Sequence, residues 1–315
     1  MKILVTGGAG FIASHLIKRL LEDGHEIVCV DNLNDYYDPE IKLKRLEQFE
    51  KQINFEKVDI TDFSSLREIF EKYKFDKIAH LAAQAGVRYS ITNPDVYINT
   101  NYLGTFNVFE LAKIYGVKDA VFASTSSVYG ESLEIPFRED SPADRAVSIY
   151  AATKRACEIM ASSYVRNSDM NITCLRFFTV YGPFGRPDMA LFKFTKNILA
   201  GEPIDVYNNG EMKRDFTFVS DIVEGFVLAL NKPMGFEIIN LGHGESVHLL
   251  KFIEVLEKKL GRKAEINFMP MQQGDVPQTF ADTTKAKEKL DFNAKIGVEE
   301  GVSFFVDWFK DYYKI

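Results

Sequence analysis

The stretch that decides the fold is MKILVTGGAGFIA, residues 1–13. Its apolar run before the glycines predicts a short buried strand, and the amphipathic pattern over residues 15–22 predicts the helix that follows. Gly7 permits a tight turn between the two, Gly10 lets the backbone approach a pyrophosphate, and Ala13 lets the helix pack closely on the strand. The N-terminus of that helix would offer free N–H groups to phosphates. The stretch therefore predicts the first strand–turn–helix unit of a dinucleotide-binding sheet.

An acidic residue follows the second predicted strand, residues 26–30. Asp31 lies at about the 20-residue offset expected for the acid that binds a ribose. Its carboxylate would accept from the ribose hydroxyls and repel a 2′-phosphate, which favours NAD over NADP. The alternative is a structural glycine turn beside an unrelated Asp, but the turn lies between a predicted strand and a predicted helix, which argues against it. The further cofactor contacts that we expect are Phe11, Ile12, Asn32, Leu81, Ala82, Ala83, Asn101 and Phe177.

The bulk composition is that of an ordinary soluble protein. The chain has 315 residues, 46% of them hydrophobic, and a net charge of −7, which argues against general affinity for nucleic acid. The apolar run at the N-terminus is broken by glycines, and no run of about 18 apolar residues follows, so we expect neither a signal peptide nor a membrane span. The chain has three cysteines: Cys29, Cys157 and Cys174. They lack the spacing of metal ligands and are too few for a disulfide framework, which predicts reduced thiols in a cytoplasmic protein.

Three potential metal ligands stand close together near residue 245. His243, Glu245 and His248 lie close together in the sequence, but they fall in a turn-rich stretch. We favour a surface loop over a metal cluster there, and we expect no metal.

Short apolar runs alternate with amphipathic stretches along the first part of the chain. The predicted strands are 3–5, 26–30, 54–58, 77–81, 119–123 and 172–177, and the predicted helices between them include 15–22, 64–73 and 100–115. Such alternation predicts a parallel sheet covered on both faces. We therefore expect an α/β fold, a Rossmann doubly wound parallel sheet in residues 1–180.

After about residue 180 the rhythm is less regular. A Gly- and Pro-rich loop precedes predicted helices at 189–199 and 249–260. We expect residues 181–315 to form a smaller α/β lobe that binds the substrate over the carboxyl ends of the sheet, where ligands bind in such folds. The two parts would be interleaved, with a return segment near 216–230.

A tyrosine and a lysine four residues apart are the candidate catalytic pair. Tyr150 and Lys154 in S-I-Y-A-A-T-K would share one face of a helix. An ammonium group near a phenol favours the phenolate, so we expect a lowered pKa for Tyr150 and a role as general base. The upstream hydroxyl cluster at 124–127 could complete a hydrogen-bond relay. A structural helix face is the alternative, and the hydroxyl cluster, taken with the dinucleotide motif, argues against it.

These motifs together resemble a known superfamily. T-G-G-A-G-F-I, A-S-T-S-S-V-Y-G, Y-A-A-T-K, R-D-F-T-F-V at 214–219 and G-D-V-P at 274–277 are similar to the extended short-chain dehydrogenases/reductases, in their sugar-nucleotide epimerase and dehydratase branch. The resemblance covers essentially the whole chain. It implies that Thr125 joins Tyr150 and Lys154 in a catalytic triad, and that the last two also contact NAD.

The resemblance also implies roles for residues that bind the two ligands. Asp59 and Ile60 would cap the adenine, Arg214 would bind a nucleotide diphosphate, Asp275 the uridine ribose, and Tyr207 would pack near the base. For Arg214 an ion pair with a neighbouring acid, Asp215 or Asp221, remains open. The same family implies a homodimer formed through helices near 100–115 and 150–164, and points to surface polysaccharide biosynthesis.

Two small residues after Thr125 narrow the reaction. Many members of this branch oxidise C4 of a hexose, and the dehydratases among them carry Asp-Glu where this chain has Ser126 and Ser127. Hydroxyls are poor acids near neutral pH, so elimination is disfavoured, and the resemblance to decarboxylases fails at Ser127. Epimerisation needs no such acid, because the ketone rotates and takes the hydride back on its other face.

The substrate is indicated by three segments, 31–39, 82–90 and 181–190, which resemble UDP-glucuronate 4-epimerases, including capsule-biosynthesis members. A sugar carboxylate suits the planar guanidinium of Arg186, with Thr179 and the two serines as neutral donors. Alternatively, Arg186 pairs with Asp188. For Arg88, carboxylate, phosphate and structural roles remain open. The competing functions are an epimerase of neutral UDP-hexoses such as UDP-glucose or UDP-N-acetylglucosamine and, more remotely, a non-catalytic NAD-binding protein.

Overall fold

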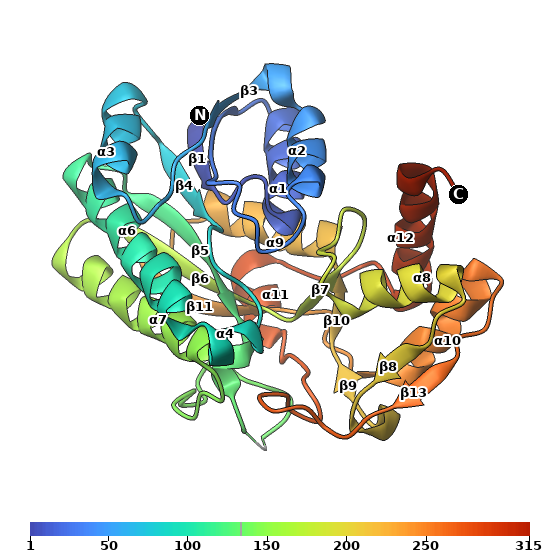
Figure 1. Cartoon of the computed structure of the whole chain (residues 1–315). Helices are drawn as coiled ribbons and strands as arrows, with labels where there is room; N and C mark the ends of the chain where they lie inside the picture. Colours follow the sequence, from blue (N-terminus) through green and yellow to red (C-terminus); the bar gives the residue numbers. More distant parts are fainter. Residues whose placement is uncertain (133) are drawn as a thin grey trace.

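A seven-stranded parallel sheet forms the centre of the molecule. In the computed structural model, which describes residues 1–132 and 134–315, its strand order is β11-β6-β5-β4-β1-β2-β3 (Figure 1). Every neighbouring pair in this sheet is parallel. The strands are β1 (Lys2–Thr6), β2 (Glu26–Val30), β3 (Ile53–Glu56), β4 (Lys77–His80), β5 (Asp119–Thr125), β6 (Asn171–Phe177) and β11 (Phe236–Leu241). The predicted doubly wound α/β fold is confirmed.

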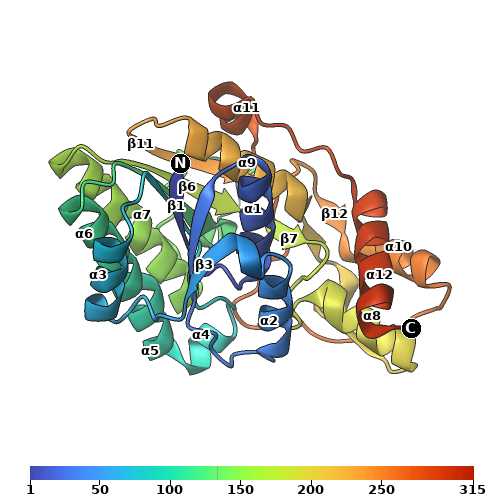
Figure 2. The same ribbon diagram turned by 90° about the horizontal axis from the view of Figure 1, so that it is seen from above.

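Helices cover both faces of this sheet (Figure 2). On one side lie α1 (Phe11–Glu22), α2 (Glu40–Glu47) and α9 (Val219–Asn231), and on the other α3 (Phe63–Lys72), α6 (Gly104–Ile114) and α7 (Ile149–Asn167). The apolar side chains of β1 alternate between two cores. Ile3 and Val5 belong to the core beneath α1 and α9, whereas Leu4 belongs to the core beneath α3 and α6. Burial on both faces explains why these strands read as continuous apolar runs.

The segment near 216–230 divides between two structures. Its first residues form β10 (Phe216–Phe218), which pairs in parallel with β7 (Thr179–Tyr181) outside the main sheet. The remainder is α9, which lies beside α1 against the main sheet. The chain then enters β11 at the edge next to β6 and continues later into α11 (Thr284–Leu290), which packs on α9 and β11.

The remaining elements gather beyond the carboxyl ends of the strands. They include the helices α8 (Ala190–Ala200), α10 (Leu249–Leu260) and α12 (Val298–Tyr313), and two small sheets made of β8 (Ile204–Val206) with β13 (Ile266–Phe268) and β9 (Lys213–Arg214) with β12 (Val247–His248) (Figure 1). Aromatic side chains of α8 and α12 pack together, with Phe192 and Phe309 ring centroids 5.2 Å apart. Shorter turns complete the chain: η1 (Glu50–Gln52), α4 (Tyr89–Thr92), α5 (Pro94–Tyr97), η3 (Ser126–Tyr129) and η4 (Asn208–Gly210).

The bounds of several predicted elements differ from the structure: helix α1, for example, begins at Phe11 rather than at residue 15. The third strand ends at Glu56 rather than at residue 58, because Glu56 is followed by a turn toward Asp59. The helix predicted at 100–115 is two helices: a π-helical turn, η2 (Ile98–Leu103), runs into α6 at Gly104. Among the helices of the described residues, none is long and apolar enough to cross a membrane.

Candidate active site

A cleft of about 660 Å³ lies at the carboxyl ends of the strands, between the main sheet and the smaller elements. This volume is typical of a site for small ligands. Its walls include every cofactor, catalytic and substrate residue expected from the sequence except Asn101. Residues from 7–13, 81–88 and 123–127 therefore meet residues from 177–194 and 204–216 in one place.

The glycine turn leaves no room for side chains where it meets β4. Gly7 has a φ of +71°, and a Cβ there would lie 2.7 Å from the backbone of Ala82. A Cβ on Gly10 would lie 2.8 Å from the carbonyl oxygen of Gly7. Helix α1 begins directly after Gly10, so its first N–H groups face the cleft beside this turn. The turn thus has the shape and polarity that a pyrophosphate requires.

Two carboxylates, Asp31 after β2 and Asp59 after β3, fix the loops that line the cleft beside the glycine turn. Asp31 accepts from the backbone N–H groups of Ala9 (3.1 Å) and Leu33 (2.8 Å). Burial raises the pKa of Asp31, although these donors and nearby Lys42 oppose the rise. Asp59 accepts from Asn32 Nδ2 at 2.7 Å and from Thr61, and these bonds outweigh its burial and lower the pKa of Asp59. Both carboxylates retain acceptor capacity toward the cleft.

Asn101 lies behind the wall of the cleft and contacts the backbone of Gln84, which lines it. Its side-chain oxygen accepts from the backbone N–H of Gln84 at 2.8 Å, and its Nδ2 donates to the carbonyl oxygen of Gln84 at 3.0 Å. This pair of bonds fixes the backbone that follows β4, next to Ala82 and Ala83. Both ends of its amide are thus used within the protein, and a direct contact between Asn101 and the cofactor stays a prediction.

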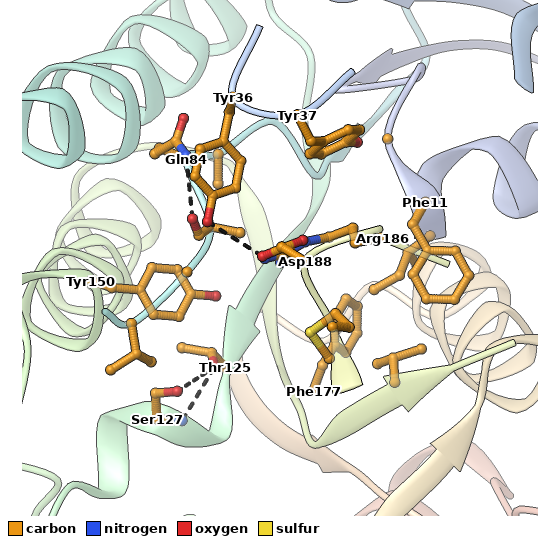
Figure 3. A pocket seen from close by; sticks show the side chains of 18 of the residues that line it. Phe11, Tyr36, Tyr37, Gln84, Thr125, Ser127, Tyr150, Phe177, Arg186 and Asp188 are labelled. Atoms are coloured by element: carbon orange, nitrogen blue, oxygen red, sulfur yellow. Dashed lines mark hydrogen bonds and ion pairs between the residues drawn. The ribbon is translucent and has the colours of Figure 1, made fainter. Parts of the chain in front are cut away.

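The two residues of the Y-A-A-T-K motif lie at the start of α7. Ser148 caps this helix by accepting from the backbone N–H of Ala151 at 3.1 Å. Tyr150 is partly buried beside Thr125, the last residue of β5, and both line the cleft (Figure 3). Thr125 Oγ1 accepts from the backbone N–H of Ser127 at 3.1 Å, which starts the turn η3. The end of β5 and the start of α7 thus hold the hydroxyl groups of Thr125, Ser127 and Tyr150 at one wall of the cleft.

We expected a lowered pKa for Tyr150, but the residues of the protein itself raise this pKa. Burial raises the pKa of Tyr150, and only the Thr125 hydroxyl and the charge of Arg186 oppose it. Lys154 is not directed at the phenol: its Nζ donates to the carbonyl oxygen of Ala123 at 2.8 Å and lies 4.6 Å from the centroid of the Phe122 ring. Burial also lowers the pKa of Lys154 to about 8.

A buried ion cluster behind this wall was not found from the sequence. Arg176 and Glu158 are both fully buried and form two hydrogen bonds of 2.9 and 2.8 Å. Ser124 Oγ donates to Glu158 Oε1 at 2.6 Å. Glu158 lies one turn beyond Lys154 on α7, and Ser124 directly precedes Thr125. The signal in the sequence was Arg176, a charged residue inside the apolar pattern of β6.

Arg186 lies in the loop between β7 and α8, and its guanidinium lines the cleft opposite Tyr150 (Figure 3). Its Nε donates to Asp188 Oδ1 at 3.0 Å, and its Nη2 donates to Asp188 Oδ2. The hydroxyl of Tyr36, from the loop after β2, donates to the same Oδ2 at 3.3 Å. The two roles considered for Arg186, a pair with Asp188 and a contact with the sugar, are therefore compatible, because Arg186 is paired with Asp188 and also lines the cleft.

Four other predicted residues meet at the mouth of the cleft. Arg88 Nη2 lies 2.9 Å from Asp275 Oδ2, and its guanidinium lies 5.1 Å from the centroid of the Tyr207 ring. Arg214 makes no ion pair among the described residues, and its Nη1 donates to the carbonyl oxygens of Lys213 and Pro277. Burial lowers the pKa of Arg214, with Asp275 opposing. This cation is thus available to an anionic ligand.

The acids considered as partners of Arg214 are used elsewhere. Asp215 is buried and accepts from the backbone N–H groups of His243, Gly244 and Ala281. Asp221 accepts from the backbone N–H of Ile296 at 3.0 Å. Within residues 1–132 and 134–315, no cluster of three or more His, Cys, Asp or Glu side chains could hold a metal ion.

Comparison with known proteins identifies the family. Residues 3–242 match the NAD dependent epimerase/dehydratase family. The chain belongs to that family. The resemblance seen in its motifs is thereby confirmed.

Individual members of the family are similar over nearly the whole chain. The UDP-glucuronate 4-epimerase of Thermodesulfobacterium geofontis is 45% identical over 312 residues, which is 98% of this chain and 96% of that protein. The crystal structure of a UDP-glucuronic acid 4-epimerase from Bacillus cereus, in complex with UDP-glucuronic acid and NAD, superposes with a TM-score of 0.93 at 34% identity, covering 99% of this chain and 100% of that one. The UDP-glucose 4-epimerase of Thermotoga maritima, with UDP-glucose, gives a TM-score of 0.92 at 33% identity and the same coverage.

Proposed function

We propose that this family member is a UDP-glucuronate 4-epimerase, which interconverts UDP-glucuronate and UDP-galacturonate. The observation that carries the proposal is the placement of Tyr150, Thr125 and Arg186 around one cleft that also contains the glycine turn. A general base, a dinucleotide site and a fork for a carboxylate are thus within reach of one sugar. Similarity to the enzymes of T. geofontis and B. cereus supports the same substrate.

The residues of the cleft fit NAD as the resident cofactor. Gly7 and Gly10 keep the turn tight, since a Cβ at either would press on backbone, and the N–H groups at the start of α1 beside this turn would hold the pyrophosphate. Asp31 would hold the adenosine ribose, Asp59 and Ile60 the adenine, and Leu81 to Ala83 the backbone wall along the dinucleotide. When bound, NAD would supply the acceptor for the hydride of C4 and the source of the hydride that reduces the ketone again.

Tyr150 is the proposed base in this reaction. Its phenolate would take the proton of the C4 hydroxyl as C4 is oxidised and return it when the ketone is reduced. Because burial holds the pKa of Tyr150 above its ordinary value, the phenolate depends on positive charge nearby, and Arg186 supplies part of it. Thr125, fixed at the end of β5, would hold the sugar hydroxyl in line with the phenol.

The serines beside Thr125 direct the reaction toward epimerisation. Ser126 and Ser127 line the cleft where an acid would be needed to protonate a leaving hydroxyl. With hydroxyls there, the C4 ketone keeps its other substituents, so rotation and return of the hydride is the remaining outcome.

The two ends of the nucleotide sugar would be held by different groups. Arg186 and Thr179 would hold the sugar carboxylate through charge-assisted and neutral hydrogen bonds. At the mouth, Arg214 is the proposed partner of the diphosphate, because it is a partly buried cation with no carboxylate on it. Asp275 and Tyr207 would hold the uridine, and Arg88 contacts both of them. Residues 1–180 would thus hold NAD, and the nucleotide sugar would lie between residues of this part, such as Thr179, and residues of 181–315, such as Arg186 and Arg214.

We also propose that the active protein is a homodimer. Exposed apolar side chains gather on η2 and α6, with one more on α7: Ile98, Tyr102, Leu103, Phe106 and Ile159. Pairing these helices with their copies would form a four-helix interface, which would remove this apolar surface from water. Light scattering of the purified protein should give twice the chain mass, and a monomer at micromolar concentration would overturn this. A cytoplasmic role in surface polysaccharide biosynthesis completes the proposal.

The substrate is tested by supplying three nucleotide sugars in parallel. Purified protein with no added cofactor should convert UDP-glucuronate to UDP-galacturonate, which would also exclude a non-catalytic NAD-binding protein. The second candidate, an epimerase of neutral UDP-hexoses, is favoured by one observation: Arg186 already pairs with a carboxylate of the protein. Faster conversion of UDP-glucose or UDP-N-acetylglucosamine than of UDP-glucuronate would establish that candidate instead.

A further inference from the structure

Asp188 occupies one side of the guanidinium that faces the sugar. Arg186 uses Nε and Nη2 for the two oxygens of Asp188, so the edge left for a ligand is the end that carries Nη1. An arginine has five N–H donors in a planar fork, and Asp188 takes two of them. A sugar carboxylate would therefore bind at the Nη1 end of the guanidinium, while Asp188 keeps the bonds from Nε and Nη2.

Asp188 is held in that position from the opposite wall. The Tyr36 hydroxyl donates to its Oδ2 (Figure 3). The centroid of the Tyr36 ring lies 4.9 Å from that of the Tyr89 ring. Gly86 makes room for this tyrosine: it has a φ of +104°, and a Cβ there would lie 2.5 Å from the Tyr36 hydroxyl oxygen. Displacing Asp188 from the guanidinium would also break this bond.

The loop that carries both charges is anchored separately. Arg45 is fully buried on α2, and its Nη2 donates to the carbonyl oxygen of Phe184 at 2.7 Å. Its Nη1 donates to the carbonyl oxygen of Ala9 in the glycine turn at 3.0 Å. The backbone two residues before Arg186 is thus tied to the dinucleotide site, and Asp188 is left to set the direction of the guanidinium and the net charge of the pair.

The pair is ionised and electrically neutral as a unit. Burial opposes the ionisation of Asp188, but the charge and hydrogen bonds of Arg186 outweigh it and lower the pKa of Asp188. A sugar carboxylate at the Nη1 end would be attracted by Arg186 and repelled by Asp188. A neutral sugar would experience neither force.

We propose that Asp188 limits the preference of the cleft for an acidic sugar over a neutral one, by sharing Arg186 with the carboxylate of the nucleotide sugar. This proposal rests on the proposed function, because it assigns the carboxylate of UDP-glucuronate to Arg186. It makes Asp188 a specificity-determining residue whose charge weakens the binding of the acidic substrate and leaves the neutral one unaffected.

The test measures the binding of UDP-glucuronate and UDP-glucose to the NAD-loaded protein by calorimetry, in the wild type and in Asp188→Asn. Two unit charges about 7 Å apart at an effective dielectric constant near 20 change a dissociation constant by tenfold or more. Solvent reduces this for a partly exposed pair, so we expect about tenfold tighter binding of UDP-glucuronate and less than about a twofold change for UDP-glucose. Asp188→Ser also removes the charge, with different hydrogen bonding, and should shift the ratio of the two constants in the same direction.

The matched control is Asp140→Asn. Asp140 accepts from Nε and Nη2 of Arg138, two residues before it, in the same arrangement but on the exposed surface away from the cleft. It should leave both dissociation constants unchanged. The proposal is overturned if UDP-glucuronate binds the Asp188 variants no more tightly than the wild type, if both sugars shift equally, or if Asp140→Asn reproduces the effect.

Failure of the proposed function has a different signature. A wild type that binds UDP-glucuronate and does not epimerise it would overturn the function and, with it, this role of Asp188. A wild type that produces UDP-galacturonate, with an unchanged binding ratio in both Asp188 variants, would overturn the role of Asp188 alone.

Discussion

Replacing Arg186 by His should divert part of the reaction to loss of carbon dioxide. Once C4 of UDP-glucuronate is a ketone, its carboxylate belongs to a β-keto acid. Carbon dioxide leaves when the C5–C6 bond breaks and its electron pair passes through C5 into the C4 carbonyl as an enolate. The enolate then takes a proton from water at C5, and return of the hydride to C4 would give a UDP-pentose. Loss of carbon dioxide requires the C5–C6 bond to align with the carbonyl π-system, and Arg186 is placed to hold the carboxylate out of that alignment.

The size of the effect follows from the contacts of Arg186. Its side chain is 21% exposed and already shares its charge with Asp188, so the interaction is not that of a bare buried cation. A hydrogen bond to a charged group contributes about 1.5–3 kcal/mol, and partial exposure places this one near the lower value. Losing about 1.5 kcal/mol of restraint corresponds to about a tenfold rise in the ratio of UDP-pentose to UDP-galacturonate.

Chromatographic separation of the products from UDP-glucuronate, with mass detection, measures this ratio directly. The matched control is Arg138→His, because Arg138 is exposed and pairs with Asp140 at the same spacing. It should give the wild-type ratio. If Arg186→His still binds UDP-glucuronate and produces the two products in the wild-type ratio, the reasoning about the carboxylate is refuted.

Four further predictions concern the base, the turn and the buried charges. Tyr150→Phe should lower kcat for epimerisation by about 10²–10⁴-fold while NAD stays bound, and a loss below about tenfold would exclude Tyr150 as the base. The pKa of Lys154 is lowered by burial from 10.5 to about 8, so between these values the unfolded chain binds the extra proton, and stability rises with pH across this window by about 3 kcal/mol. Urea unfolding at a series of pH values should show that Lys154→Met lacks this rise, whereas parallel pH profiles would contradict the assignment. Gly7→Ala forces a side chain into a φ of +71° against backbone and should cost about 1–3 kcal/mol of stability and most of the bound NAD, as read from thermal unfolding and the absorbance of the purified protein. Glu158→Gln leaves the charge of Arg176 buried without its partner and should lower the free energy of unfolding by about 3–5 kcal/mol, so a loss below about 1 kcal/mol in denaturant would count against the cluster.

Much of the fold was predictable from local patterns. Strands buried on both faces read as apolar runs, and the glycine turn lies between such a run and an amphipathic helix, so the sheet and its dinucleotide site followed from spacing alone. The edge strand β11 did not, because the half-exposed pattern of residues 236–238 does not say which sheet it joins. Pairing of distant segments depends on tertiary packing, which a single sequence pattern does not contain.

The site was predictable as a set of residues and less so as a set of contacts. Sequence spacing indicated that Tyr150 and Lys154 share a helix face, but the direction of the Lys154 amine depends on the carbonyl of Ala123, which comes from another strand. The use of Asn101 by the backbone of Gln84 has the same origin. Arg186 was expected to have one partner or another, and only the geometry shows that a guanidinium can serve both.

The proposed epimerisation by transient oxidation at C4 is tested most directly with UDP-glucuronate that carries deuterium at C4. Purified protein without added cofactor should produce UDP-galacturonate with the deuterium still at C4, because the same hydride leaves and returns within the cleft that Tyr150 and the glycine turn share. UDP-galacturonate that has lost the label to solvent, or the absence of UDP-galacturonate from a folded protein that contains NAD, would contradict it.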